Sequence, residues 1–281
     1  MGDGARLRTW TTGSTIPRRL PVVMLHGGPG IPDYLAPVAD IIDDICPVHR
    51  YDQRGTGGSR WEGDHTIARH VRDLALLLDA WGHDRVVLMG HSFGTNMANY
   101  FLLAHPERVA GLIQIAGPFL DPWREACQAE ERARRSDEQQ IRLEELDVIE
   151  SRTEAEEIEY LALSWFTDHA DRERAWDWAL ASTRMQRPVN YVMNSQLNSL
   201  KKIDALESHV DEIRERMPPG TVIIGGDGDP RPADALRRIG AHLNCGVVII
   251  PGAGHDPWME APDQFGAVLR AAVERQTQAA N

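Results

Sequence analysis

The sequence predicts an α/β fold in which a mostly parallel sheet carries helices on both faces and a helical insertion interrupts the core. Residues 1–117 and 219–281 alternate short apolar runs, typical of buried strands, with amphipathic stretches typical of helices. Such alternation is characteristic of parallel strands joined by helices. Residues 118–218 show long helical stretches and no clear strand. We therefore expect a core domain formed by the two outer segments and a helical cap domain formed by 118–218.

The core elements follow one another in a regular order. In residues 70–82, Val71, Leu74 and Leu78 share one helical face, and Gly82 is expected to end that helix. Apolar runs predict the strands, and the segments between them predict the other helices. The expected strands are 21–26, one that ends within 48–55, 85–90, 111–117, 221–226 and 246–252, and the expected helices are 70–82, 93–109, 232–243 and 262–276.

The composition indicates a soluble protein. No run of about 18 apolar residues could span a membrane, and the N-terminus lacks the apolar segment of a secretory signal, so we expect a cytoplasmic location. A formal charge of −12 argues against nucleic acid and anionic membranes as partners. Cys46, Cys127 and Cys245 are too scattered for a zinc site or a disulfide framework. We expect no metal or other cofactor, and the oligomeric state is open.

The stretch GHSFG, residues 90–94, has the surroundings that a nucleophile elbow requires. A predicted strand precedes Ser92 and a predicted helix follows it, so the serine lies on a strand–turn–helix connection. Gly90 and Gly94 allow this turn to close tightly and hold the hydroxyl clear of the sheet. We predict that Ser92 is a nucleophile.

A serine hydroxyl needs a base, and His255 is the candidate. It follows the last predicted strand, on a loop that Gly252 and Gly254 open. His91 adjoins the nucleophile in sequence, but a sharp turn is expected to point its side chain elsewhere. We therefore assign His91 a packing or surface role.

The base in turn needs a carboxylate that holds its tautomer and stabilises its charged form. The loop after the penultimate predicted strand offers Asp227 and Asp229. We favour Asp229 because it lies deeper in the loop. Asp227 stays an alternative, since either residue can instead cap the following helix.

Two backbone N–H groups are expected to stabilise an oxyanion. One belongs to Phe93, at the start of a helix, where partial positive charge favours an anion. The other comes from the loop HGGPG, residues 26–30, whose glycines permit close approach. We favour Gly28, with Gly27 as the alternative.

Four motifs together resemble those of the α/β-hydrolase superfamily. They are HGGPG, YDQRGTGGS (residues 51–59), GHSFG and GAGHDPWMEAPDQF (residues 252–265), and the serine, aspartate and histidine also follow that superfamily's order. The resemblance covers the core and implies an eight-stranded, mostly parallel sheet with a helical cap after strand six. It also implies that Asp52 and Arg54 position loops near the site and do not react.

The combination of HGGPG with DQRGTGGS is most similar to the proline iminopeptidase group of serine peptidases. That group usually has Gly and Trp beside the nucleophile, where this chain has His91 and Phe93. The group also uses cap glutamates to hold the free amino group of its substrate. The cap residues expected to serve the substrate here are Trp165, Trp176 and Trp178, with Glu156, Glu157 or Glu159 as a source of an amine-binding carboxylate.

These residues predict a serine hydrolase that cleaves an ester or amide bond of a small molecule through an acyl-enzyme, as a proline iminopeptidase does. One alternative is a carboxylesterase or lactonase that acts on a small apolar acyl compound, for example in secondary metabolism. The other is a non-hydrolytic binding protein on the same fold. Chromogenic proline amides and short-chain esters separate the first two hypotheses, and the presence of nucleophile, base and acid argues against the third.

Overall fold

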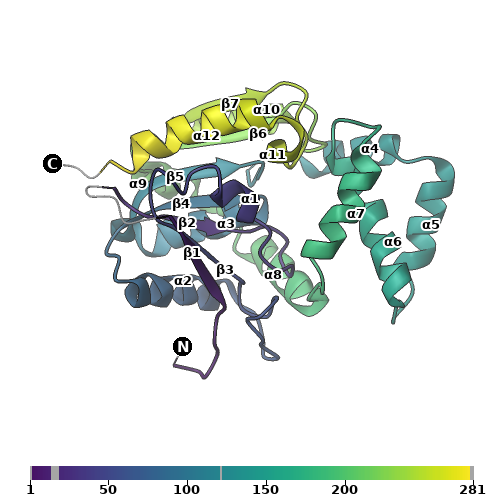
Figure 1. Ribbon diagram of the computed structural model, residues 1–281, viewed down its shortest axis with the longest axis horizontal. Coiled ribbons are helices and arrows are strands. Elements are labelled where there is room, and N and C mark those ends of the chain that lie inside the picture. The colour runs from purple at the N-terminus through teal and green to yellow at the C-terminus, as the bar shows by residue number, and fades with distance from the viewer. Residues whose placement is uncertain (1, 14–18, 121, 279–281) are drawn as a thin grey trace.

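The computed structural model describes residues 2–13, 19–120 and 122–278. They form a central sheet covered by helices, and a group of further helices lies beyond one end of the sheet (Figure 1). The strand order is β1-β3-β2-β4-β5-β6-β7, and only β1 is antiparallel to its neighbour. The strands are β1 Thr9–Thr12, β2 Val22–Leu25, β3 Val48–Tyr51, β4 Val86–His91, β5 Val109–Ile115, β6 Val222–Gly226 and β7 Gly246–Ile250.

The sheet of the described residues has seven strands, one fewer than the eight that the resemblance implies. The described segment before β1 forms no strand, and the backbone of its last residue, Arg8, bonds instead to the loop after β3. Arg8 N donates to Ser59 Oγ at 2.8 Å, and Arg8 O accepts from Asp52 N at 3.0 Å. The helical insertion therefore follows the fifth strand of this sheet, not the sixth.

Local chemistry explains where the core helices begin and end. Thr66 caps α2 (Ile67–Trp81) by accepting a hydrogen bond from Arg69 N, and Gly82 ends it with φ 73°. Helix α3 (Phe93–Ala104) is shorter than the predicted 93–109, since Pro106 lacks an N–H and opens the separate turn η1 (Pro106–Arg108). The remaining core helices are α1 Ala36–Ala39, α10 Ala233–Leu243, α11 Pro257–Glu260 and α12 Pro262–Gln276.

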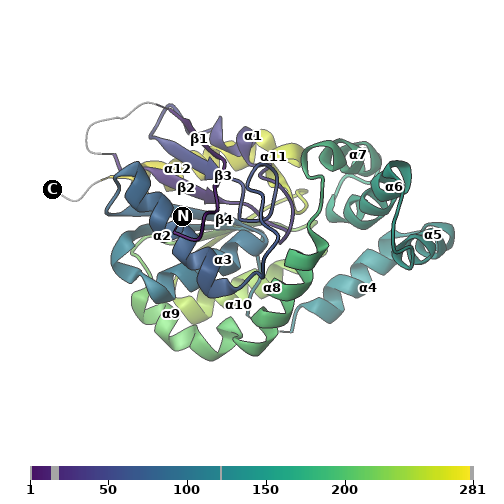
Figure 2. The ribbon, with the colours of Figure 1, turned by 90° about the horizontal axis from the view of Figure 1, so that it is seen from below.

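The sheet separates two apolar clusters. Helices α2, α3 and α10 cover one face, and α1 and α12 cover the other (Figure 2). Phe101 of α3 and Phe265 of α12 are fully buried, one on each face. Because both faces are covered, strands such as β2 and β4 are buried along their whole length.

The helices between β5 and β6 fall into two groups. Helices α5 to α7 pack around a small apolar cluster of their own that includes Leu146 and Phe166, whereas Leu197 and Ile213, from α8 and α9, join the cluster on the α3 face of the sheet. None of the described helices is both long and apolar enough to cross a membrane. The bounds are α4 Arg124–Arg134, α5 Asp137–Asp147, α6 Glu154–Trp165, η2 Phe166–Asp168, α7 Ala175–Met185, α8 Tyr191–Ile203, η3 Leu206–His209 and α9 Val210–Arg216.

Candidate active site

Ser92 lies at the sharp turn between β4 and α3. Its backbone has φ 53° and ψ −121°, which non-glycine residues rarely adopt and which costs about 1–3 kcal/mol. Ser92 N donates to Ile115 O at 2.9 Å and ties the turn to β5. A Cβ on Gly94 would lie 2.0 Å from Leu25 O, so the turn packs closely only with glycine there. The surrounding structure thus holds the serine in a strained conformation at the edge of the sheet.

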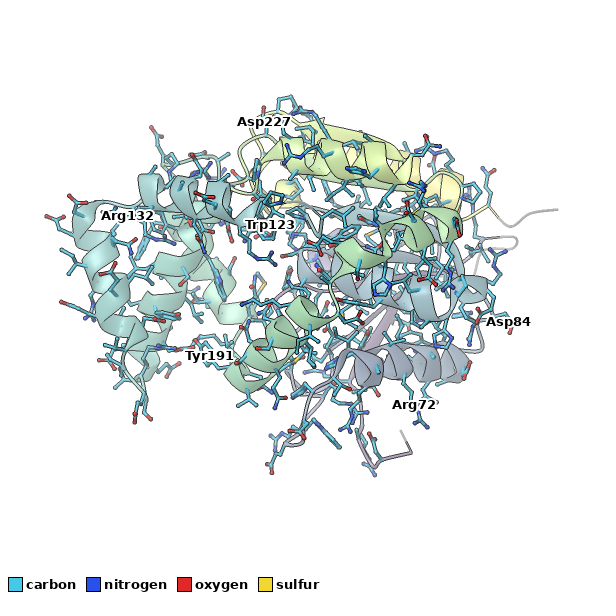
Figure 3. All side chains as sticks on the ribbon, turned by 180° about the vertical axis from the view of Figure 1, so that it is seen from behind. Arg72, Asp84, Trp123, Arg132, Tyr191 and Asp227 are labelled. Atoms are coloured by element: carbon cyan, nitrogen blue, oxygen red, sulfur yellow. The ribbon has the colours of Figure 1, made fainter. Side chains whose placement is uncertain are left out.

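His255 and Asp229 come together from the loops after β7 and β6. His255 Nδ1 lies 2.8 Å from Asp229 Oδ2, and each residue is 6% exposed. Asp227 instead accepts a hydrogen bond from Gly252 N at 2.7 Å and is exposed at the outside of the molecule (Figure 3). Of the two candidate aspartates, only Asp229 contacts the histidine.

The pair is strongly coupled. Burial would raise the pKa of Asp229, but the charges of His255 and Arg231 outweigh burial and lower it to about 2. Burial and Arg231 would lower the pKa of His255, but Asp229 raises it above the ordinary value. Asp229 is therefore ionised and accepts from Nδ1–H, which leaves Nε2 of neutral His255 able to accept a proton.

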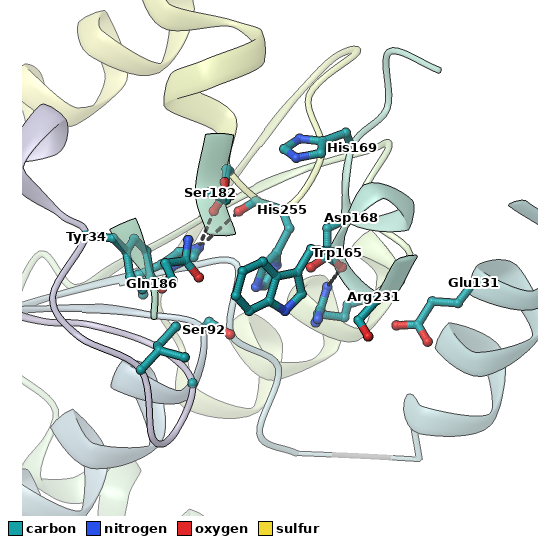
Figure 4. Close-up of a pocket in the computed structure, with 15 residues that line it drawn as sticks. Tyr34, Ser92, Glu131, Trp165, Asp168, His169, Ser182, Gln186, Arg231 and His255 are labelled. Atoms are coloured by element: carbon teal, nitrogen blue, oxygen red, sulfur yellow. Dashed lines mark hydrogen bonds and ion pairs between the residues drawn. The ribbon is translucent and has the colours of Figure 1, made fainter. Parts of the chain in front are cut away.

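Ser92 and His255 line the same cavity of about 140 Å³, together with Trp165 and Arg231 (Figure 4). We name it the His255 cavity. Ser92 Oγ makes no hydrogen bond to His255 or to any other described group. Such contacts are often loose before substrate binds.

The sharp turn was expected to point the His91 side chain away from the site, but the side chain points toward it. Its ring lies 4.8 Å from that of His255, and Nε2 donates to His255 O at 3.0 Å. Nδ1 accepts from the Tyr34 hydroxyl at 2.5 Å, and that hydroxyl accepts from Gly27 N at 3.0 Å. Burial, together with the charge of His255, lowers the pKa of His91 well below its ordinary value, so the ring is neutral, as this pattern requires. The backbone turn at Ser92 brings the side chain of His91 back toward the loop after β7 that carries His255, the base loop.

The two expected oxyanion donors flank Ser92. Gly28 has φ 115°, a conformation that favours glycine, and lines the His255 cavity. Gly27 is less suited because Tyr34 already accepts its N–H. Phe93 opens α3, whose first turn has no side-chain cap, so its N–H is free to meet an anion.

A second cavity of about 180 Å³ adjoins the first and shares Gly28, Ser92 and Arg231 with it. Lys201 and Arg124 line it, and we name it the Lys201 cavity. Both cavities are smaller than the roughly 300–1,000 Å³ of sites for drug-sized ligands.

Of the three tryptophans expected to bind substrate, Trp165 lines the His255 cavity. Trp176 is 36% exposed and packs edge-on against Phe166 at 5.8 Å. Trp178 packs beneath Arg174, whose guanidinium lies 4.3 Å from its ring. Neither Trp176 nor Trp178 is among the residues that line either cavity.

The three suggested cap glutamates also lie elsewhere. Glu156 takes part in the capping box of α6, while Glu157 pairs with Arg152 at 2.6 Å and Glu159 with Arg142 at 2.8 Å. The acidic residues that line the His255 cavity are instead Glu131, Asp168 and Asp256.

Several positioning residues carry no sequence signal of their own. Arg231 donates to Asp168 at 2.7 Å and to Asp229 at 3.1 Å, and so links the acid loop to η2. Glu260 accepts from Gly254 N at 2.9 Å and from Ala170 N at 2.7 Å, and so links the base loop to the residues after η2. Arg231 is the last residue of the stretch DGDPR (residues 227–231), and its place beside Asp229 is the sequence signal that could have suggested it.

The DQRG motif connects loops beside the site. Asp52 accepts from Asp33 N at 2.9 Å and from Gly58 N at 2.7 Å. Arg54 donates to both carboxylate oxygens of Asp73, at 2.6 and 2.5 Å. Neither Asp52 nor Arg54 lines the two cavities. Among the described residues, no group of three or more His, Cys, Asp or Glu side chains could hold a metal ion.

Known proteins share this architecture. The chain is 28% identical over 251 residues, 88% of this chain and 89% of the relative, to the protein named "Putative carbamate hydrolase RutD" of Shigella flexneri serotype 5b (strain 8401). The crystal structure of proline iminopeptidase from Mycobacterium smegmatis superimposes with a TM-score of 0.69 at 20% identity, covering 99% of this chain and 97% of that one. The meta-cleavage product hydrolase CumD of Pseudomonas fluorescens IP01 gives a TM-score of 0.73 at 17% identity, with 97% and 95% covered.

At these identities the solved structures support the fold alone. The family model described as alpha/beta hydrolase fold matches residues 21–262, which is most of the chain. The match spans the Ser92 turn, the Asp229 loop and the His255 loop. The protein therefore belongs to the α/β-hydrolase fold family and is a hydrolase of that family.

Proposed function

We propose that the protein is a serine hydrolase that cleaves an ester or amide bond of a small molecule through an acyl-enzyme on Ser92. One observation carries the proposal: a strained serine between β4 and α3 lines the same cavity as His255, whose Nδ1 lies 2.8 Å from buried Asp229. A nucleophile, a base and an acid that orients the base are the groups that this chemistry needs.

In the proposed mechanism, His255 Nε2 takes the Ser92 proton as Oγ attacks the carbonyl carbon. Asp229 holds the Nδ1–H tautomer and stabilises the imidazolium that forms. The Phe93 and Gly28 N–H groups donate to the oxyanion of the tetrahedral intermediate. His255 then protonates the leaving group, and water releases the acyl group by the same route.

The helices α4 to α7 are proposed to act as a cap over this chemistry, within the predicted segment 118–218. Trp165 and Asp168 supply cap side chains to the wall of the His255 cavity. The backbone carbonyl of Asp168, at the end of η2, also accepts a hydrogen bond from the backbone N–H of His255 at 2.8 Å. A cap that both encloses the substrate and supports the base would exclude water from the acyl transfer.

An aminopeptidase-like activity is supported by Glu131 of α4. Its carboxylate lines the His255 cavity and makes no ion pair with an arginine, lysine or histidine of the described residues (Figure 4). Asp168 is less suited to bind an ammonium group because Arg231 already neutralises it at 2.7 Å. Glu131 can therefore take the role that the sequence analysis gave to the glutamates of α6.

An esterase activity is the second candidate, and the cationic side chains of the Lys201 cavity favour it. An uncompensated positive charge beside the nucleophile repels the free amino group that an aminopeptidase substrate carries. A carbamate, the bond named for the RutD relatives, undergoes the same attack at its carbonyl carbon and belongs in the same comparison.

The test compares turnover of 4-nitrophenyl butyrate, proline 4-nitroanilide and a 4-nitrophenyl carbamate by the wild type and by Ser92→Ala. We expect turnover of at least one of them by the wild type, reduced by about 10⁴-fold or more in the variant. Turnover of esters only would remove the aminopeptidase candidate. Equal activity of the wild type and Ser92→Ala would refute the proposal.

A further inference from the structure

The Lys201 cavity differs in charge from the rest of the molecule. The chain has a net charge of −12 and only two lysines, yet the described residues that line this cavity include Lys201, Arg124 and Arg231 and no acidic side chain. Arg231 is neutralised by its contacts with Asp168 and Asp229. The cations that make no ion pair within the described chain are therefore half-buried Lys201 and exposed Arg124.

Lys201, at the end of α8, makes no ion pair among the described residues, and the exposed Glu207 attracts its charge less than Arg124 repels it. Its side chain is half-buried, it makes no ion pair, and Nζ lies 5.2 Å from the centroid of the Phe93 ring. Burial, and then the charge of Arg124, lower the pKa of Lys201 to about 8. A half-buried cation held beside a second cation is unfavourable unless an anion joins them.

Other hydrogen-bond donors of the cavity are also unused. Trp123 lines the cavity where the cap helices join the core (Figure 3), and its buried indole N–H has no acceptor. Asn96 of α3 is buried, lines the cavity and makes no side-chain hydrogen bond within the described chain. Cations and unused hydrogen-bond donors around one small cavity are the groups that bind a carboxylate.

The position of the cavity indicates which part of the substrate would carry the charge. In the proposed function His255 protonates the leaving group, so the leaving group faces the His255 cavity. Ser92, Phe93 and Gly28 line the Lys201 cavity, and His255 does not. The acyl part of the substrate would therefore extend toward Lys201.

We propose that the substrate carries a carboxylate on its acyl part, which Lys201 and Arg124 bind in the Lys201 cavity. The substrate class is then a monoester or monoamide of a small dicarboxylic acid. This inference rests on Ser92 as the nucleophile of the proposed function.

The test uses two esters of equal length: mono-4-nitrophenyl adipate, which carries a free carboxylate, and 4-nitrophenyl hexanoate, which does not. We expect the wild type to prefer the adipate ester in kcat/KM after spontaneous hydrolysis is subtracted. Lys201→Met should lower the adipate-to-hexanoate ratio about 10-fold or more, the loss expected for one charge-assisted hydrogen bond. Arg124→Gln should lower the same ratio.

Lys202→Met is the matched control, because Lys202 is the adjacent, exposed lysine and does not line the cavity. It should leave the ratio unchanged. Equal ratios in the wild type and Lys201→Met would overturn the inference. Calorimetric titration with adipate reads the same site without turnover: binding by the wild type that Lys201→Met loses supports the inference, and no binding by the wild type contradicts it.

Labelling of Ser92 by a fluorophosphonate, measured on the same samples, separates the two proposals. If Ser92 is labelled but the ratio does not respond to Lys201→Met, only the carboxylate inference fails. If Ser92 is not labelled, the proposed function fails, and adipate binding still reports on the anion site. Circular dichroism checks that each variant is folded.

Discussion

The Tyr34 hydroxyl links Gly27, in the same loop between β2 and α1, to His91 at the end of β4, so Tyr34→Phe is expected to affect both stability and catalysis. The hydroxyl accepts from Gly27 N at 3.0 Å and donates to His91 Nδ1 at 2.5 Å, and the Tyr34 side chain is buried. Phenylalanine keeps the ring, which stacks near Trp258 with centroids 6.4 Å apart. The substitution leaves one buried donor and one buried acceptor unpaired, at about 1–3 kcal/mol each. We expect the free energy of unfolding to fall by about 2–6 kcal/mol.

The same substitution should lower kcat by about 10- to 100-fold with little change in KM, because Gly27 precedes the proposed oxyanion donor Gly28. The assay is urea denaturation followed by steady-state kinetics on whichever ester the wild type turns over. Tyr100→Phe is the matched control. It removes a single hydrogen bond to Asp204 O at 2.5 Å, away from the site, and should cost about 1 kcal/mol without changing kcat. If Tyr34→Phe is no less stable than Tyr100→Phe and keeps its kcat, the proposed role of the Tyr34 hydroxyl between Gly27 and His91 is wrong.

The acid and the base allow two further predictions. Asp229→Asn should lower kcat by about 10⁴-fold, since the tautomer of His255 is no longer held, whereas Asp227→Asn, on the exposed aspartate of the same loop, should change it little; equal effects would contradict the assignment. Activity needs neutral His255, and because its folded pKa is raised, kcat/KM should fall as the pH drops, with a midpoint above 6.5. Burial raises the pKa of nearby Asp256 to about 6, so the profile is repeated with Asp256→Asn. This variant should keep the midpoint above 6.5. A midpoint well below 6.5 in both the wild type and the variant would argue against His255 as the base.

Much of the fold follows from local sequence. Apolar runs predicted the central strands within a few residues, and glycine predicted the end of α2 at Gly82. The resemblance implied eight strands, whereas the sheet of the described residues has seven. The apolar runs did not indicate β1, because this edge strand has the sequence TWTT and none of its residues is buried.

Residues that the structure brings together could be predicted where a short motif carries them: Ser92 and His255 line one cavity, and Asp229 contacts His255. Ser92, Asp229 and His255 each follow a predicted strand, and parallel strands bring their carboxyl ends to one edge of the sheet. The direction of the His91 side chain could not be predicted, because the strained turn at Ser92 decides it. The choice of Trp165 over the other cap tryptophans depends in the same way on how the cap helices pack.

Lys201 and Glu131 were equally hidden, since their proposed roles depend on which ionic partners they lack among the described residues. A lysine near the end of an amphipathic helix and a glutamate in an acidic helix are typical of solvated surfaces. Only the three-dimensional arrangement brings them to the two cavities that Ser92 lines. Specificity is therefore harder to predict from this sequence than the chemistry of the bond.

The most direct test of Ser92 as the nucleophile is mass spectrometry after reaction with a fluorophosphonate. The wild type should gain the mass of one adduct, located by peptide mapping to Ser92, and Ser92→Ala should gain none while it remains folded. An undiminished adduct in Ser92→Ala, or no adduct in the folded wild type, would contradict the proposed acyl-enzyme mechanism.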